Sequence, residues 1–202
     1  MTKSENGELK SICVFCGSSA GERPLYRQAA EALGAAMARR RLTLVYGGGS
    51  IGLMGVLARS ARAHGCEVVG VIPEPLQTQE LAGAQIGELI VVKTMHERKA
   101  VMTERADAFI AMPGGFGTLD ELFETLTWGQ LGIHNKPIGL FNIDDFFQPL
   151  LRLIENAVAE GFVRPIDQGR LVVADEANAM LTAIAAHKPP PGLITWMDLD
   201  QA

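Results

Sequence analysis

Short apolar runs alternate with longer amphipathic stretches along nearly the whole chain. The apolar runs predict strands at residues 12–16, 42–46, 67–72, 88–92, 108–111, 138–141 and 171–173. The stretches between them predict helices at 24–40, 51–64, 95–106, 118–131, 145–160 and 176–186. Mostly apolar strands that alternate with helices are typical of a parallel sheet with helices on both faces. We therefore expect an α/β fold built on a doubly wound parallel sheet.

The chain has 202 residues, about the size of one domain. No shift in composition and no internal repeat divides it. We expect one domain over 11–187, a flexible N-terminus over 1–10 and a C-terminal tail over 188–202. Three prolines at 189–191 prevent a helix there, so this tail is either a packing arm or disordered. Residues 74–87 form a longer irregular stretch and are a candidate active-site loop.

Composition narrows the class of protein. Hydrophobic residues make up 48% and charged residues 20%, as in an ordinary globular domain. A net charge of −5 argues against a general nucleic-acid binder. No apolar run reaches the roughly 18 residues of a membrane span, and the polar N-terminal residues do not resemble a secretory signal. We expect a cytoplasmic protein without nucleic-acid or membrane partners.

Three cysteines, an odd number, do not form a disulfide framework. Cys13 and Cys16 form a CxxC, but residues three apart in a strand point to opposite faces. We interpret them as buried thiols, although a redox or metal pair stays open. The four histidines show no spacing typical of a metal site, so no metal is expected.

Loops that contain glycine follow three of the predicted strands, at 17–19, 47–55 and 113–118. Ligands of a doubly wound sheet bind at the carboxyl ends of the strands. Gly47, Gly49 and Gly52 match GxGxxG, but the acidic residue expected after the next strand would have to be Glu74, beyond Pro73. A dinucleotide site, a phosphate or sugar pocket and tight helix packing all remain open.

The strongest signal is the run from Pro113 to Glu121, which reads PGGFGTLDE. It follows a predicted strand and opens a predicted helix, so free N–H groups and the positive helix end would form an anion site. Thr118 can add a hydroxyl donor. The alternative is a tight turn that Thr118 caps.

The helix after this loop has two different faces. At 100° per residue, the apolar positions of the expected core stripe are Leu119, Leu122, Phe123 and Leu126. Glu121 would then point roughly away from the core, beside Thr125 and Trp128. Glu121 is either a partner of the helix dipole or a functional group. Trp128 suggests that a ligand or a second subunit covers this face.

A second informative helix begins at Met95-His96-Glu97-Arg98-Lys99. Arg98 shares an apolar stripe with Val101 and Met102. It either extends to water or is aimed at an anion in a cleft, and spacing alone does not decide. His96 is interpreted as a hydrogen-bonding group at the helix start.

These motifs resemble those of the Lonely Guy family, the cytokinin riboside 5′-monophosphate phosphoribohydrolases. The run up to Glu121 resembles the family's PGGxGTxxE motif, and Met95 to Lys99 resembles its partner motif, an Arg-Lys pair after Met-His. The resemblance covers nearly the whole chain, including 12–19, 46–49 and 127–134. Many members of this family are labelled lysine decarboxylase, a name that the family's chemistry does not support.

The resemblance implies a Rossmann-like homodimer that cleaves the N-glycosidic bond of a cytokinin riboside 5′-monophosphate or AMP, without cofactor or metal. It implies Arg98 and Glu121 as the catalytic pair. The implied substrate-binding residues are Ser18, Gly48, Glu80, Met95, Lys99, Gly114, Gly115, Phe116, Gly117, Thr118, Leu119, Asp120 and Thr127. Asp120 stands where relatives commonly carry Glu, and 81–85 depart from the family's usual pattern near the base pocket, which affects base specificity more than activity.

Chemistry supports this assignment independently. Cleavage of a ribosyl C–N bond develops oxocarbenium charge on the sugar, which a carboxylate such as Glu121 can stabilise. An arginine stays protonated at neutral pH, so Arg98 suits a hydrogen-bonding and electrostatic role. The rival functions are a PLP-dependent decarboxylase, with Lys99 or Lys136 as the Schiff-base lysine, and a non-enzymatic nucleotide-binding module.

Overall fold

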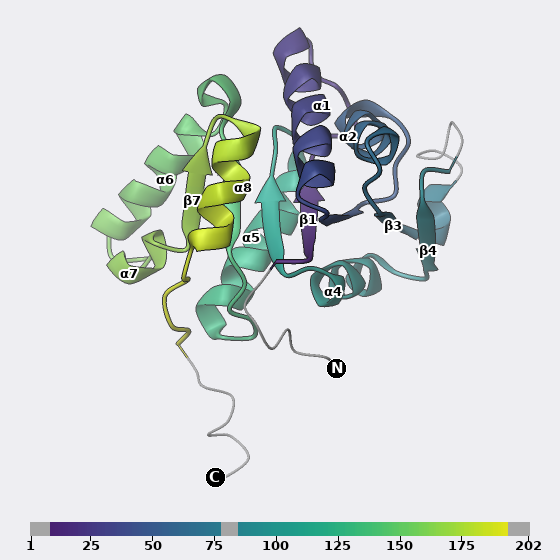
Figure 1. Cartoon of the computed structure of the whole chain (residues 1–202). Helices are drawn as coiled ribbons and strands as arrows, with labels where there is room; N and C mark the ends of the chain where they lie inside the picture. Colours follow the sequence, from purple (N-terminus) through teal and green to yellow (C-terminus); the bar gives the residue numbers. More distant parts are fainter. Residues whose placement is uncertain (1–8, 78–84, 194–202) are drawn as a thin grey trace.

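The protein is built on one seven-stranded sheet, seen in Figure 1. The computed structural model describes residues 9–77 and 85–193. The strand order is β4-β3-β2-β1-β5-β6-β7, and every neighbouring pair is parallel. The strands are β1 (Ser11–Phe15), β2 (Thr43–Tyr46), β3 (Val68–Pro73), β4 (Glu88–Val92), β5 (Ala108–Ala111), β6 (Ile138–Phe141) and β7 (Leu171–Ala174).

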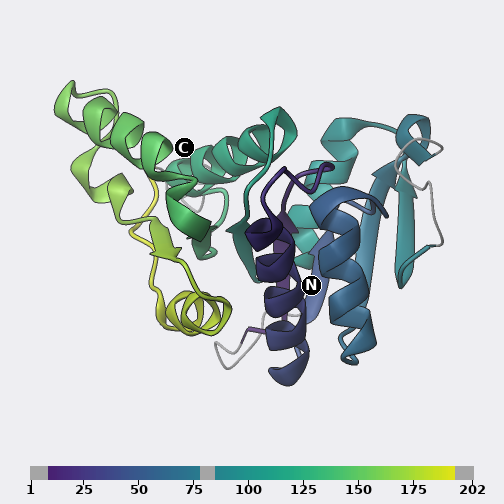
Figure 2. The same cartoon turned by 90° about the horizontal axis from the view of Figure 1, so that it is seen from above.

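Helices cover both faces of the sheet, as Figure 2 shows from above. One face carries α1 (Pro24–Arg39), α2 (Gly52–Ala63) and α8 (Ala177–Ala186). The opposite face carries α4 (Met95–Arg105), α5 (Phe116–Leu131) and α6 (Gln148–Ala159). Short helical turns complete the described part: η1 (Glu74–Leu76), η2 (Ile143–Asp145) and α7 (Pro165–Gln168). The predicted doubly wound, Rossmann-like fold is confirmed.

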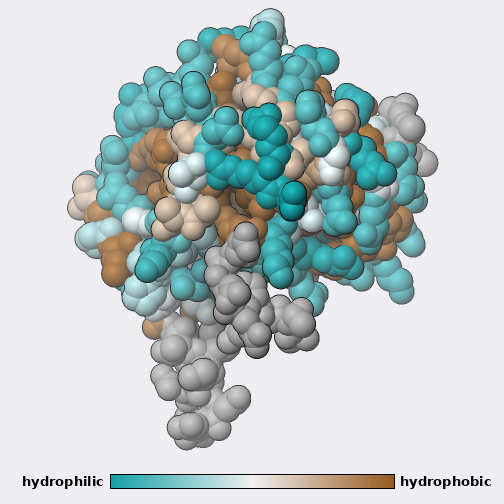
Figure 3. Space-filling model, viewed as in Figure 1, coloured by the Kyte–Doolittle hydropathy of each residue, from teal (hydrophilic) through white to brown (hydrophobic). Residues whose placement is uncertain are grey.

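The sheet separates two hydrophobic cores because successive strand residues point to opposite faces. Cys16 belongs to the core under α1, α2 and α8, whereas Cys13 belongs to the core under α4 and α5. All three cysteines are free and buried, so the interpretation as buried thiols is confirmed. Polar residues cover much of the surface in Figure 3, with apolar residues in separate patches. No helix of the described residues is long and apolar enough to span a bilayer.

The predicted helices and strands are all present, and two helices start more than one residue away from the predicted position. α5 begins at Phe116, not at 118, because the extended Gly115 is its N-cap. α6 begins at Gln148, not at 145, because Asp144 and Asp145 adopt left-handed backbone conformations that end η2. The sequence analysis did not predict η1 and α7.

The buried face of α5 differs from the predicted core stripe. Its buried positions are Thr118, Glu121, Leu122, Thr125 and Gly129. Phe123, expected in the core, is 41% exposed, and Leu119 and Leu126 are only partly buried. Glu121 therefore points inward, and the prediction that it lies away from the packed face was wrong.

The chain leaves α5 through a turn that contacts two helices. The His134 ring donates from Nε2 to the Thr125 carbonyl of α5 at 3.0 Å and accepts from the Lys136 backbone N–H at 3.2 Å. Lys136 Nζ donates to the Thr103 carbonyl of α4 at 2.6 Å. The described part of the C-terminal tail also packs here: Arg170 donates to the Pro191 carbonyl, and the Leu193 N–H donates to the Gln130 carbonyl.

We predict that His134 makes folding sensitive to mild acid. Burial, and then the nearby cations Lys136 and Arg170, lower the pKa of His134 to about 4, whereas an unfolded histidine titrates near 6.5. The unfolded chain therefore binds this proton first as the pH falls. The stabilisation from neutral His134 is complete above pH 6.5 and is lost as the pH falls towards about 4.

This is checked by urea unfolding of wild type and His134→Gln between pH 7 and 4. The variant should lose less free energy of unfolding over this range than the wild type. His64→Gln, which changes an exposed histidine, is the control and should follow the wild type. Equal pH slopes for His134→Gln and wild type would contradict the prediction.

Candidate active site

The candidate site lies where the strand order reverses. The chain runs outward from β1 to β4 and then returns to β5 on the other side of β1. The carboxyl ends of β1 and β5 therefore meet, and the Gly17 N–H donates to the Pro113 carbonyl at 3.1 Å. A cavity of about 160 Å³ opens here, lined mainly by residues after β1 and β2, at the start of α5 and on α4. Such a switch point is where α/β sheets bind ligands.

The N-terminus of α5 faces this cavity with its backbone donors. Gly115, Phe116, Gly117 and Thr118 line the cavity. Gly115, at the N-cap, has no side chain to bond the N–H groups of the first turn, and it leaves room for a ligand to approach them. The free donors and the positive end of a 16-residue helix create a site for an anion.

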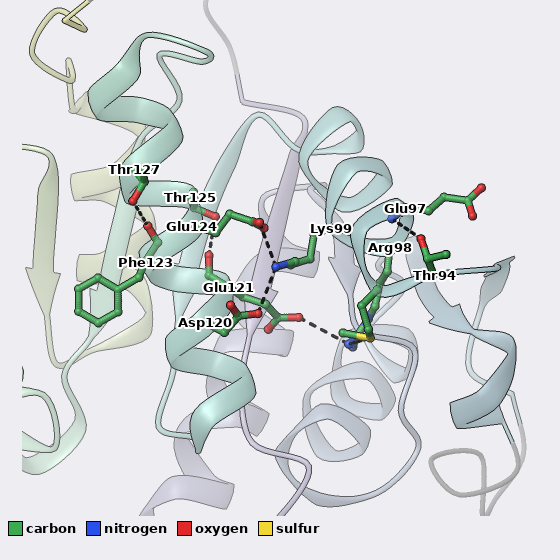
Figure 4. Close-up of polar contacts among 11 residues, drawn as sticks. Thr94, Glu97, Arg98, Lys99, Asp120, Glu121, Phe123, Glu124, Thr125 and Thr127 are labelled. Atoms are coloured by element: carbon green, nitrogen blue, oxygen red, sulfur yellow. Dashed lines mark hydrogen bonds and ion pairs between the residues drawn. The ribbon is translucent and has the colours of Figure 1, made fainter.

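Two side-chain bonds similar to a capping box fix the start of α4. The Glu97 N–H donates to Thr94 Oγ1 at 3.1 Å (Figure 4). The Lys93 N–H, just before the N-cap Thr94, donates to Glu97 Oε2 at 2.8 Å. These reciprocal bonds satisfy donors at the helix start and define where the helix begins. The next residue, Arg98, is thereby directed towards the sheet.

Arg98 is buried, with 7% of its surface exposed. Its Nε donates to the Val71 carbonyl at 3.1 Å, and its Nη2 donates to the Gly47 carbonyl at 3.0 Å. A Cβ at position 47 would lie 2.0 Å from Nη2, so only glycine leaves room for the guanidinium. Arg98 is thus held in the cavity wall, so the interpretation that it extends to water was wrong.

Glu121 faces Arg98 across the cavity and is 8% exposed. Its Oε1 lies 3.7 Å from Arg98 Nη1, and Figure 4 marks this ion pair with a dashed line. Met95 contributes its Sδ 4.0 Å from the same nitrogen. The pair places one carboxylate and one guanidinium on opposite sides of a small space next to the anion site.

Two thiols lie beneath this pair. Burial raises the pKa of Cys13 and Cys16 well above that of a free thiol, and the Glu121 carboxylate raises both further. Both cysteines are therefore neutral at physiological pH. Cys16 lines the cavity as a thiol, not as a reactive thiolate.

Lys99 points away from the cavity towards α5. Its Nζ lies 2.9 Å from Glu124 Oε1 and 3.2 Å from Asp120 Oδ2 (Figure 4). Its side chain is only 12% exposed. Lys99 and Asp120 were expected to contact substrate, but here they join α4 to α5.

The structure brings together about half of the predicted site residues. Those that line the cavity are Ser18, Arg98, Gly115, Phe116, Gly117, Thr118 and Glu121. Gly114 lines an adjoining cavity of about 250 Å³. Five others do not line the described cavity: Gly48, Met95, Lys99, Leu119 and Asp120. Thr127, also outside it, is exposed and donates to the Phe123 carbonyl. Glu80 lies outside the described residues.

Some cavity residues were missed. Gly47 lines the cavity in place of the predicted Gly48, and Cys16, Gly17 and Met54 also contribute. The glycine run at 47–49 was the available signal for Gly47, but choosing among its members requires knowing where Arg98 lies. Met54 gave no signal, because an apolar helix residue is ordinarily interpreted as core. Among the described residues, no group of His, Cys, Asp and Glu could hold a metal ion.

The fold and this site define a class: a Rossmann-like α/β protein with a cavity at the strand-order reversal that a helix N-terminus faces. Solved structures with the same fold include the molybdenum cofactor carrier protein of Chlamydomonas reinhardtii, at a TM-score of 0.63 and 21% identity, covering 86% of this chain and 94% of that one. The molybdenum cofactor binding protein of Rippkaea orientalis also has a TM-score of 0.63, at 20% identity, covering 86% and 93%. At such identities the likeness shows the fold alone.

Sequence comparison identifies the family. The family described as "Possible lysine decarboxylase" matches residues 54–184. The chain is 47% identical over 197 residues to "Cytokinin riboside 5'-monophosphate phosphoribohydrolase LOG7" of Arabidopsis thaliana, covering 96% of this chain and 91% of that protein. It is 48% identical over 181 residues to LOG5 of the same plant, covering 90% and 79%. The chain belongs to this family, and the resemblance seen in its motifs is confirmed.

We predict that Gly114 is required for the shape of the loop. A Cβ there would lie 2.1 Å from Thr118 Oγ1 and 2.9 Å from the Gly17 nitrogen. Gly114→Ala should therefore lower the free energy of unfolding by about 1–3 kcal/mol, as overpacking does. Gly117→Ala is the matched control, because its Cβ would meet nothing within 4 Å. Calorimetry that shows equal melting temperatures for the two variants would refute this role.

Proposed function

We propose that the protein hydrolyses the N-glycosidic bond of nucleoside 5′-monophosphates with an adenine-type base, cytokinin riboside 5′-monophosphates and AMP among them. The products are the free base and ribose 5-phosphate. The observation that carries this proposal is the buried Arg98–Glu121 pair beside the N-terminus of α5. The names of relatives with 47–48% identity support the same reaction.

The start of α5 would bind the 5′-phosphate. Its N–H groups and helix dipole favour a dianion, and the Thr118 hydroxyl lies in the same lining. Binding energy from this remote group can hold the sugar in a reactive position. An uncharged 5′-hydroxyl would gain little from these donors, which is why the proposal names the monophosphate.

Glu121 and Arg98 would act on the sugar and the leaving base. Water adds to C1′ as the C1′–N bond breaks, and the base carries away the bond electrons and takes up a proton. The Glu121 carboxylate stabilises the oxocarbenium charge and orients the attacking water. Arg98, fixed by two carbonyls, supplies hydrogen bonds and positive charge to the base or phosphate.

Two rival functions receive less support. A Schiff-base lysine would have to face a cofactor pocket, whereas Lys99 is paired with carboxylates and Lys136 with a helix carbonyl. A binding module that performs no chemistry would need the glycine loop but not a buried carboxylate opposite a buried guanidinium. The same nucleotide experiment separates this module from an enzyme.

A homodimer is the second part of the proposal. Phe116 is 93% exposed and Phe123 is 41% exposed, seven residues apart on α5, with Ile133 half-exposed beyond the helix. Large apolar residues grouped on one exposed face are typical of a contact surface. Trp128, from which the sequence analysis predicted a dimer, is partly buried within the chain. A second copy on this face of α5 would exclude water near the cavity.

The decisive experiment incubates the protein with a panel of nucleosides and their 5′-monophosphates and identifies the released bases. We expect kcat/KM for AMP to exceed that for adenosine by about 100-fold or more, since phosphate binding is lost. Glu121→Gln should lower kcat by about 100-fold or more. The variant should still fold, because Arg98 keeps its two carbonyl partners.

The Glu155→Gln variant is the control, because it makes the same change at an exposed residue of α6 outside the cavity lining. It should retain most of the activity. Full turnover by a folded Glu121→Gln protein would refute the catalytic role. Equal kcat/KM for adenosine and AMP would show that the glycine loop does not bind phosphate, and binding without base release would favour the module.

The dimer is tested by Phe123→Glu. A charge buried in a contact is unfavourable, so this variant should sediment as a monomer of about half the wild-type mass and lose activity. Leu153→Glu, on the exposed side of α6, is the matched control and should leave both unchanged. A wild type that sediments as a fully active monomer would disprove the proposed assembly.

A further inference from the structure

The helices that carry Arg98 and Glu121 are joined by the turn that follows α5. Lys136 Nζ donates to the Thr103 carbonyl of α4 at 2.6 Å. The Lys136 N–H donates to His134 Nδ1, and His134 Nε2 donates to the Thr125 carbonyl of α5 at 3.0 Å. A continuous chain of hydrogen bonds therefore runs from α4 to α5 without passing through the cavity.

The surroundings of the Lys136 ammonium group stabilise a cation. Thr103 lies in the last turn of α4, at the negative end of the helix dipole, and its carbonyl otherwise accepts only a long 3.4 Å bond from the Ala106 N–H among the described residues. The ammonium also lies 6.0 Å from the centre of the Phe109 ring. Burial lowers the pKa of Lys136, so these contacts replace part of its lost hydration.

The hydrogen bonds and packing of His134 favour a neutral imidazole ring. Nδ1 accepts while Nε2 donates, which fixes one tautomer. The ring packs against Phe109 with centroids 5.3 Å apart. A Cβ on Gly129 would lie 3.4 Å from His134 Cε1, an ordinary van der Waals contact, so the ring lies directly beside this part of α5.

The attachment points lie close to the reactive pair. Thr103 is five residues beyond Arg98, about 7.5 Å along α4, and Thr125 is four residues beyond Glu121, about 6 Å along α5. Thr125 Oγ1 donates in turn to the Glu121 carbonyl at 2.7 Å. The Arg98–Glu121 contact of 3.7 Å is longer than a hydrogen bond. That contact by itself does not fix the separation, so the spacing of the two helices must contribute.

We propose that Lys136 and His134 are positioning residues that set the separation of Arg98 and Glu121 by bracing α4 against α5. This rests on the proposed hydrolase function. Neither residue lines the cavity, so each acts through the helices and not on the substrate. Lys99, with Glu124 and Asp120, forms a second link between the same helices, so we expect the protein to stay folded when the first link is lost.

Steady-state kinetics with AMP test the link between α4 and α5 through Lys136 and His134, which we call the brace. Lys136→Met should lower kcat by about tenfold or more, since displacements of about 1 Å in an active site can cost 100-fold. KM should change less than threefold, because the phosphate loop is attached to β5. Lys136→Arg, which keeps a cationic donor, should recover most of the rate. His134→Ala should resemble Lys136→Met.

A double-mutant cycle separates positioning from general destabilisation. In a Glu121→Gln background the Lys136→Met change should have little further effect, because the geometry that it sets no longer matters. Arg40→Met is the matched control: it removes a side-chain bond from Arg40 to the Asn178 carbonyl, far from the site. It should lower stability without lowering kcat. Additive losses in the cycle, or a rise in KM alone, would overturn the proposal.

Hydrogen exchange in the ligand-free protein tests the link between the two helices without a measurement of activity. Lys136→Met should speed amide exchange at 101–105 and 125–131 but not in α8. Unchanged exchange would overturn the brace itself. A wild type that hydrolyses no nucleotide would refute the proposed function, and the positioning role with it, whereas faster exchange would still establish the link between the helices.

Discussion

The burial of one guanidinium organises the site. A buried charge is tolerated only when its hydrogen bonds are satisfied, and Arg98 meets this condition through the Val71 and Gly47 carbonyls. Leaving a buried donor without its hydrogen-bond partner typically costs about 1–3 kcal/mol, and more for a charged group. The ends of β2 and β3 must therefore stay where they are for α4 to pack as it does. The same requirement explains why position 47 is a glycine, because any side chain there would displace Arg98.

Close backbone contacts then place the anion site beside this charge. The Gly17 N–H bonds to the Pro113 carbonyl, and a Cβ on Gly52 would lie 2.2 Å from the Ser18 carbonyl carbon. Three loops that are distant in sequence thus meet with almost no side chains between them. The first turn of α5 is presented to the cavity from a fixed backbone, which preorganises its N–H donors.

The sequence predicted the architecture because strand–helix alternation and short apolar runs depend on local pattern alone. The same reasoning failed on the inward face of α5. A helical wheel places apolar residues inside, but Thr118, Glu121 and Thr125 are buried while Phe123 is exposed. A helix that borders a polar cavity violates the rule where it carries function. Gly47, Met54 and the direction of Lys99 depend on contacts between distant segments, which no local pattern contains.

The charges that line the cavity distinguish between possible reactions, which neither the fold nor the family's description as "Possible lysine decarboxylase" does. Carrier proteins with the same fold show that a doubly wound sheet does not by itself define an activity. Lysine carries a single carboxylate and ammonium groups, so it offers the N-terminus of α5 only one negative charge. A phosphorylated sugar brings a dianion at one end and, in the transition state, a cation near the carboxylate. The cavity lining supplies a counterpart for each of these charges: the first turn of α5 for the dianion and Glu121 for the developing cation.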